Sequence, residues 1–117
     1  MNSVRPEGQS QRDQLLRELQ EHAARMIFGT VSEVYRTCGN PNCRCKRGGP
    51  KHGPFMQISY RGASGKTTGY HVPSELGPAV REGVDAWHGF QELARRLAEL
   101  NREELWAQHR EAKRNLS

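Results

Sequence analysis

The three cysteines of the chain lie close together in the segment TCGNPNCRCKRGGPKHG, residues 37–53. The spacing is Cys38-x4-Cys43-x-Cys45-x6-His52. Three thiolates and one imidazole form a standard tetrahedral ligand set for structural zinc. The glycines and prolines of the segment allow the backbone to turn around an ion. The pattern therefore predicts a closed, structural Zn²⁺ site whose ligands are Cys38, Cys43, Cys45 and His52.

Two other interpretations of this segment stay open. The first is three free cysteines beside an exposed histidine, although free cysteine is usually buried among apolar side chains and the neighbours here are Asn, Arg and Lys. The second is a redox thiol that the neighbouring cations activate. A catalytic zinc is disfavoured because no carboxylate lies nearby to act as a general base. We therefore expect a protein without enzymatic activity.

Positive charge is concentrated in the middle third of the chain. No Asp or Glu occurs from Val34 to Ser74, although the whole chain has 13 acidic residues and a net charge of +5. Such segregation favours an anionic partner, most commonly nucleic acid. The candidate phosphate-binding residues are Arg36, Arg44, Lys46, Arg47, Lys51, Arg61 and Lys66.

Aromatic residues accompany these cations. Tyr35 and Tyr70 are candidates for stacking on bases, whereas Phe55 and Tyr60 are expected to pack in a small core. A two-stranded ribbon can enter the major groove of a duplex. We therefore expect DNA rather than RNA as the partner.

Hydrophobic spacing predicts two helices around the cysteine segment. Residues 1–9 are polar and are expected to be a disordered tail. Leucines recur with helical spacing from Leu15, which predicts an N-terminal helix over 10–28 with Ser10 as its N-cap. Apolar residues recur every three or four positions from Val80 to Leu105, which predicts a long helix within 74–117.

The residues between the helices read as three strands. Residues 29–37, 55–60 and 66–72 are rich in β-branched and aromatic residues or alternate in polarity, and RGASG supplies the glycines of a hairpin turn. The expected module, 29–73, carries the cysteine segment between its first two strands. The fold class is thus α+β: a small three-stranded antiparallel sheet with a zinc knuckle between strands 1 and 2, flanked by an N-terminal helix and a long C-terminal helix.

The helices suggest further partners. Gly83 and Gly89 weaken the long helix, so it needs tertiary support from the N-terminal helix, from a second copy of the protein, or from both. We expect a homodimer through the long helix. In an alternative interpretation the protein is an adaptor or inhibitor that binds another protein through its helices, with zinc only bracing the fold. No apolar run is long enough for a bilayer or a secretory signal, so we expect a cytoplasmic protein and no membrane partner.

The segment from Thr30 to Val72 resembles a family of short bacterial and phage proteins classed as a domain of unknown function. The shared pattern is like G-x-[LV]-x-x-x-Y-x-x-C-G-x-P-x-C-x-C, followed by H-G-P-[FY] and a strand that ends in Tyr. The resemblance continues through Val72–Leu76 into the long helix and suggests a link to mobile elements. It implies the fold but no activity. The matching positions are Gly29, Tyr35, Cys38, Gly39, Pro41, Cys43, Cys45, His52, Gly53, Pro54, Phe55 and Tyr60.

Overall fold

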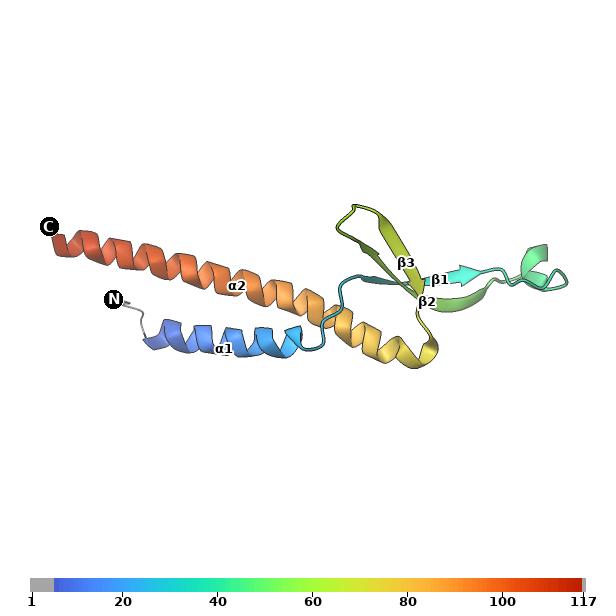
Figure 1. Ribbon diagram of the computed structural model, residues 1–117, viewed down its shortest axis with the longest axis horizontal. Helices are drawn as coiled ribbons and strands as arrows, with labels where there is room; N and C mark the ends of the chain where they lie inside the picture. Colours follow the sequence, from blue (N-terminus) through green and yellow to red (C-terminus); the bar gives the residue numbers. More distant parts are fainter. Residues whose placement is uncertain (1–5, 117) are drawn as a thin grey trace. The chain divides into compact units, whose positions relative to one another are not determined.

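The computed structural model describes residues 6–116 (Figure 1). It has an N-terminal helix, a three-stranded antiparallel sheet and a long C-terminal helix, so the predicted fold class is confirmed. The elements are α1 (Pro6–Ala23), β1 (Thr30–Arg36), the short 3-10 helix η1 (Arg44–Arg47), β2 (His52–Arg61), β3 (Thr67–His71), a second 3-10 helix η2 (Ser74–Leu76) and α2 (Gly77–Leu116).

The chain divides into two compact units. The helical unit comprises the residues up to Met26 together with those from Asp85 onward, and the sheet unit is Ile27–Val84. Helix α2 begins in the sheet unit and continues into the helical unit. Each unit has its own contacts and is described separately.

The strands of the sheet unit follow the order β1-β2-β3. Ile58 of β2 lies opposite Val31 of β1 and Tyr70 of β3. Directly opposed residues share a face of an antiparallel sheet, so these three side chains lie on one face. Gln57 and His71 are likewise opposed, and they lie on the other face. The register between β1 and β2 shifts between Val34 and Arg36, at a bulge.

The residues before and after the sheet close the small core of this unit. The backbone N–H of Ile27 donates to the carbonyl of Gly83 over 2.8 Å. Arg81 forms an exposed ion pair with Glu33 of β1 over 3.2 Å. Val72, just after β3, is only 5% exposed. These contacts hold the first turns of α2 against the sheet unit.

The helical unit consists of α1 and α2 packed side by side in opposite directions (Figure 1). Arg12 of α1 donates to the Asn101 side chain over 3.1 Å and forms an ion pair with Glu104 of α2. About three helical turns toward the other end of the pair, the His22 ring lies against Gly89, where a β-carbon would come within 2.7 Å of it. Gly89 thus permits close approach of the two helices and does not interrupt α2.

Several boundaries differ from the predicted ones. Helix α1 begins at Pro6 and ends at Ala23, whereas the sequence predicted a helix over 10–28. Residues 6–9 are therefore helical and do not belong to the predicted disordered tail, whose first five positions lie outside the described residues. Strand β2 begins at His52, three residues before the predicted start at Phe55. The long helix is continuous over 40 residues.

A glycine at the entry to β1 gives the first testable prediction. Gly29 has φ 155°, and a β-carbon there would lie 2.8 Å from the Ile58 side chain and 3.0 Å from the Ser59 carbonyl oxygen. Gly29→Ala should lower the free energy of unfolding by about 1–3 kcal/mol. Thermal or denaturant unfolding measures this loss.

Gly62→Ala is the matched control, because its β-carbon would meet only the Tyr60 ring at an ordinary 3.8 Å. Equal stability of the two variants would contradict the close approach at Gly29.

Candidate metal centre

The register of β1 and β2 brings the ends of the cysteine segment together. Arg36 at the end of β1 lies opposite His52 at the start of β2. Cys38 follows Arg36 by two residues, so its side chain lies close to that of His52. Gly53 has φ 142°, and a β-carbon there would lie 2.8 Å from the carbonyl oxygen of Val34. Glycine at this position thus permits the close strand pairing beside the bulge.

Backbone hydrogen bonds fold the residues between the two strands. The N–H of Cys43 donates to the carbonyl of Asn40 over 3.2 Å, and the N–H of Lys46 donates to that of Cys43 over 3.1 Å. Helix η1 then carries Cys45 inward, where it is 6% exposed. Gly48 follows η1 in the left-handed region with φ 82°. These turns direct the cysteine side chains toward one point.

The four predicted ligands converge. The ligand atoms of Cys38, Cys43, Cys45 and His52 all lie within 4.8 Å of one another. The sulfur atoms of Cys38 and Cys45 are 3.6 Å apart, and 3.2 Å separates the Cys43 sulfur from Nε2 of His52. With metal–sulfur bonds of about 2.3 Å, sulfur atoms of a tetrahedral site lie roughly 3.8 Å apart. The four side chains are therefore close enough to bind one metal ion.

The pKa values of the Cys43 and Cys45 thiols are shifted in opposite directions. The backbone N–H of Cys45 donates toward the Cys43 sulfur and, with the His52 side chain, lowers the pKa of Cys43 to about 6. For Cys45 the backbone N–H of Cys38 also lowers the pKa, but burial and the neighbouring thiols outweigh it and raise the pKa above its ordinary value. A cation at the centre would favour all three thiolates at once, since it would compensate their mutual repulsion.

The convergence also bears on the other interpretations of this segment. A lowered pKa is what a reactive thiol requires, and Cys43 meets that condition. However, a reactive thiol requires only one activated cysteine. Three unrelated free cysteines would have no reason to converge on the same point as a histidine. Four donors around one point match a metal site in particular.

All seven candidate phosphate-binding residues are exposed, but they occupy different parts of the sheet unit. Arg44, Lys46 and Arg47 belong to η1, next to the ligand cluster. Arg36 lies on a sheet face, where it donates to the Gln57 side chain over 3.3 Å. Arg61 follows Gln57 by an even number of positions in β2, so the two side chains lie on the same face. The remaining two, Lys51 and Lys66, lie in the segments that precede β2 and β3.

The two candidate stacking residues, Tyr35 and Tyr70, do not both lie on the sheet face that carries Gln57 and Arg36. Tyr70 is 54% exposed but lies on the face of Ile58, where its ring stacks on Tyr60 with centroids 5.9 Å apart. The hydroxyl groups of the two tyrosines are 3.3 Å apart, and the pKa of Tyr70 is raised by its hydrogen bond to Tyr60. Tyr35 is 56% exposed at the bulge. The structure therefore separates Tyr70 from Arg36.

Phe55, which the sequence predicted as a core residue, and His71 accompany Arg36. Phe55 and His71 form an edge-on ring pair with centroids 6.0 Å apart. Together with Arg36 they line a depression of about 550 Å³ that also includes Cys38 and His52 of the ligand cluster. Strand alternation alone would have placed Phe55 with Gln57, but the contribution of His71 required the pairing of β2 with β3.

Comparison with known proteins identifies the family. The fold and the ligand cluster define a small α+β protein with a three-cysteine, one-histidine centre. Residues 8–82 match a family described as a domain of unknown function, DUF6788, and the chain belongs to that family. Searches of curated proteins and of solved structures found no match. In the described part of the chain, neither helix is long and apolar enough to cross a membrane.

Removal of one ligand tests the centre. Cys43→Ser should abolish metal binding and remove the cooperative thermal transition of the sheet unit, because structural metal contributes on the order of 10–16 kcal/mol to folding in small modules. Elemental analysis measures the bound metal, and differential scanning calorimetry measures the transition.

Asn42→Ser is the control, since Asn42 is exposed in the same loop and is not one of the clustered donors. Retention of both the metal and the transition by Cys43→Ser would show that the four side chains do not act as one centre.

Proposed function

We propose that the protein is a non-catalytic nucleic-acid-binding protein whose sheet unit is stabilised by a structural zinc ion, with DNA as the favoured ligand. One observation carries the proposal. Within the unit that holds the ligand cluster, residues 34–74 expose seven basic side chains and contain no acidic residue. Clustered exposed cations without interspersed acids are typical of a phosphate-binding surface.

The chemistry of the donors supports zinc as the metal. Three cysteines and one histidine are soft or borderline ligands that suit a closed tetrahedral zinc site. Hard oxygen donors, which calcium and magnesium require, are absent from the described cluster. Three thiolates and one divalent ion leave a single negative charge, which the surrounding cations outnumber. Zinc would therefore order this segment without cancelling its positive potential.

The cations fall into two groups that could contact a nucleic acid in different ways. Arg44, Lys46 and Arg47 of η1 are held by the backbone that also carries Cys43 and Cys45. A bound ion would fix their positions for contacts with phosphates. The second group, Arg36 and Arg61, lies on the sheet face that carries Gln57, and Lys51 and Lys66 lie outside both groups.

On that face, Arg36 lies beside the ring pair of Phe55 and His71. This is the part of the surface where an unstacked base or sugar could be contacted in addition to phosphate. Because Tyr70 lies on the opposite face, it is not part of this surface.

The expected cellular setting follows from the same chemistry. The three cysteines are free and lie within reach of one ion, and a reducing compartment such as the cytoplasm keeps thiols available for a metal. The segment lacks a carboxylate that could act as a general base, which supports a binding role. An association with phage or other mobile elements remains part of the proposal.

A second candidate function is that of an adaptor or inhibitor that binds another protein. The exposed apolar side chains of the helical unit favour it, since Leu105 is 59% and Trp106 is 56% exposed. Large exposed apolar side chains often anchor protein interfaces. A protein of this kind would form a stable complex with its partner and would show no salt-dependent binding to nucleic acid.

Metal identity and removal give the third prediction. Protein purified without chelators should contain zinc as its only transition metal in stoichiometric amount. Chelation should abolish amide protection in β2 and β3 while α1 and the part of α2 from Asp85 stay protected, because every ligand belongs to the sheet unit. Elemental analysis and hydrogen exchange measure these outcomes. Absence of a bound transition metal would contradict the zinc proposal.

Removal of the η1 cations gives the fourth prediction. The triple variant Arg44→Ala, Lys46→Ala and Arg47→Ala should weaken binding to duplex DNA by at least about tenfold at roughly 50 mM salt and reduce the slope of log K against log salt by about 2–3, since each phosphate contact contributes about 0.9. Fluorescence anisotropy over a salt series measures both quantities. Metal content should not change.

A control with the same change in charge separates specific contacts from net charge. Arg102, Arg110 and Lys113 are exposed on α2 within the helical unit, and their replacement by Ala should alter the slope by much less. If both triple variants behaved alike, the η1 cations would not form a defined binding surface. If the unchanged protein bound neither DNA nor RNA at low salt, the adaptor function would be favoured instead.

A further inference from the structure

The helical unit has little core of its own. Among its described residues, the buried apolar side chains are Ala86 and Leu93, which are 3% and 8% exposed. Leu16 of α1 and Trp106 of α2 are 47% and 56% exposed. Two helices bury only one stripe each when they pack as a pair, and a stable helical layer usually needs a further element. Much of the apolar surface of the described helices is therefore exposed.

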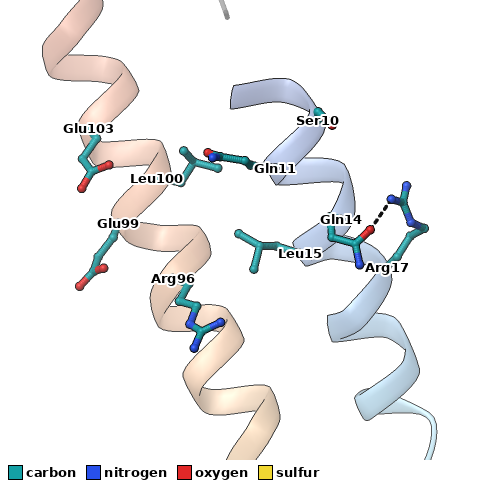
Figure 2. A pocket seen from close by; sticks show the side chains of 9 residues that line it. All are labelled: Ser10, Gln11, Gln14, Leu15, Arg17, Arg96, Glu99, Leu100 and Glu103. Atoms are coloured by element: carbon teal, nitrogen blue, oxygen red, sulfur yellow. Dashed lines mark hydrogen bonds between the residues drawn. The ribbon is translucent and has the colours of Figure 1, made fainter. Parts of the chain in front are cut away.

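One flank of the helix pair is hollowed. A groove of about 550 Å³ runs between α1 and α2, and Leu15 and Leu100 point into the space between the helices (Figure 2). Both leucines are half-buried. The groove thus has an apolar centre that remains open to solvent. Its lining residues are Ser10, Gln11, Gln14, Leu15, Arg17, Arg96, Glu99, Leu100 and Glu103.

Charge is distributed unevenly along this groove. Arg17 of α1 and Arg96 of α2 lie toward one end, whereas Glu103 of α2 and Ser10 of α1 lie toward the other (Figure 2). Glu99 lies between Arg96 and Glu103 on α2. The antiparallel packing produces this order, because residue numbers increase along α1 in the direction in which they decrease along α2. The groove therefore has a positive end, an apolar centre and a negative end.

We propose that this groove is the interface with a second copy of the chain, related to the first by a two-fold axis through the apolar centre. A two-fold rotation reverses the direction of the groove. It places the positive end of each copy, with Arg17, against the negative end of the other, with Glu103, and it brings the leucines of both copies together. The helices of the two copies then form a four-helix arrangement, which is a common way for helix pairs to complete a core.

Trp106 extends the same surface. It follows Glu103 by three residues on α2, and residues at this spacing are neighbours on a helix face. Trp106 thus continues α2 beyond Glu103, at the end of the groove where a second copy in the proposed dimer would present its arginines. An exposed aromatic side chain next to a cation fits an interface in which both are desolvated. The surface thus contains an anchor residue in addition to the leucines.

A second copy fits this groove better than the other possible occupants. A nucleic acid would meet Glu103, which repels phosphate, whereas the charge of Glu99 is already paired with Arg95. An unrelated protein could cover the leucines, but the groove by itself already supplies both halves of a complementary charge pattern. All residues of the interface belong to the helical unit, so the dimer requires neither the metal nor nucleic acid. The inference therefore stands apart from the function proposed above.

Charge exchange between the two ends tests the inference on the full chain. Arg17→Glu places like charges opposite each other in a dimer of that variant, and Glu103→Arg does the same at the same contacts. Each variant should dimerise at least about tenfold more weakly than the unchanged protein. An equimolar mixture of the two variants should associate again as a heterodimer, and the double variant should form homodimers. Sedimentation velocity over a concentration series measures the association.

Leu105→Gln is the matched control. Leu105 is 59% exposed on α2 but does not line the groove, so this variant should dimerise as the unchanged protein does. Circular dichroism checks that helix content is retained in every variant. The inference is overturned if the chain is monomeric at all concentrations, if the mixture of charge variants does not associate, or if Leu105→Gln alone dissociates the dimer. Association that requires another protein would likewise overturn it.

Discussion

The sheet unit depends on the convergence of four donor side chains within 4.8 Å of one another. This constraint connects the end of β1, the helix η1 and the start of β2, which are otherwise joined by a segment of mostly exposed polar residues and glycines. Such a segment cannot bury enough apolar surface to offset the entropy of ordering it. Coordination by a single ion would order it through a few strong bonds, and this explains how a segment without apolar residues can have a defined conformation.

The same constraint would help the cations of η1 to act as the binding surface that we propose. Flexible basic tails attract phosphate, but they lose conformational entropy when they bind. Arg44, Lys46 and Arg47 alternate with or follow the ligands Cys43 and Cys45, so fixing the ligands also limits the backbone of the cations. The ordering that the ion supplies to the fold would then serve binding as well. Positive charge and metal coordination are therefore coupled properties of one segment.

Much of the fold could be predicted from the sequence, because its signals are local. The 3.6-residue periodicity that reaches Leu105 predicted a long helix, and α2 is continuous. The spacing of Cys38, Cys43, Cys45 and His52 predicted the cluster, since ligand type and short separation already limit the geometry. The start of α1 was less evident. Pro6 suits the first turn of a helix, but the polar residues after it carry no apolar periodicity.

The arrangement of the surface depended on information that the sequence does not contain locally. Tyr70 and Arg36 lie on opposite faces of the sheet because β2 pairs with β3 in a particular register and because β1 has a bulge between Val34 and Arg36. A shift of one residue would exchange the faces.

The groove of the helical unit likewise depends on which turns of α1 and α2 are adjacent, a relation set by contacts such as that of Arg12 with Asn101. Long-range pairing of this kind determines which predicted residues act together. Each unit consequently has a well-defined local structure and an incomplete core. In our proposals the two cores are completed by different means: an ion would complete the sheet unit, and a second chain would cover the helical unit.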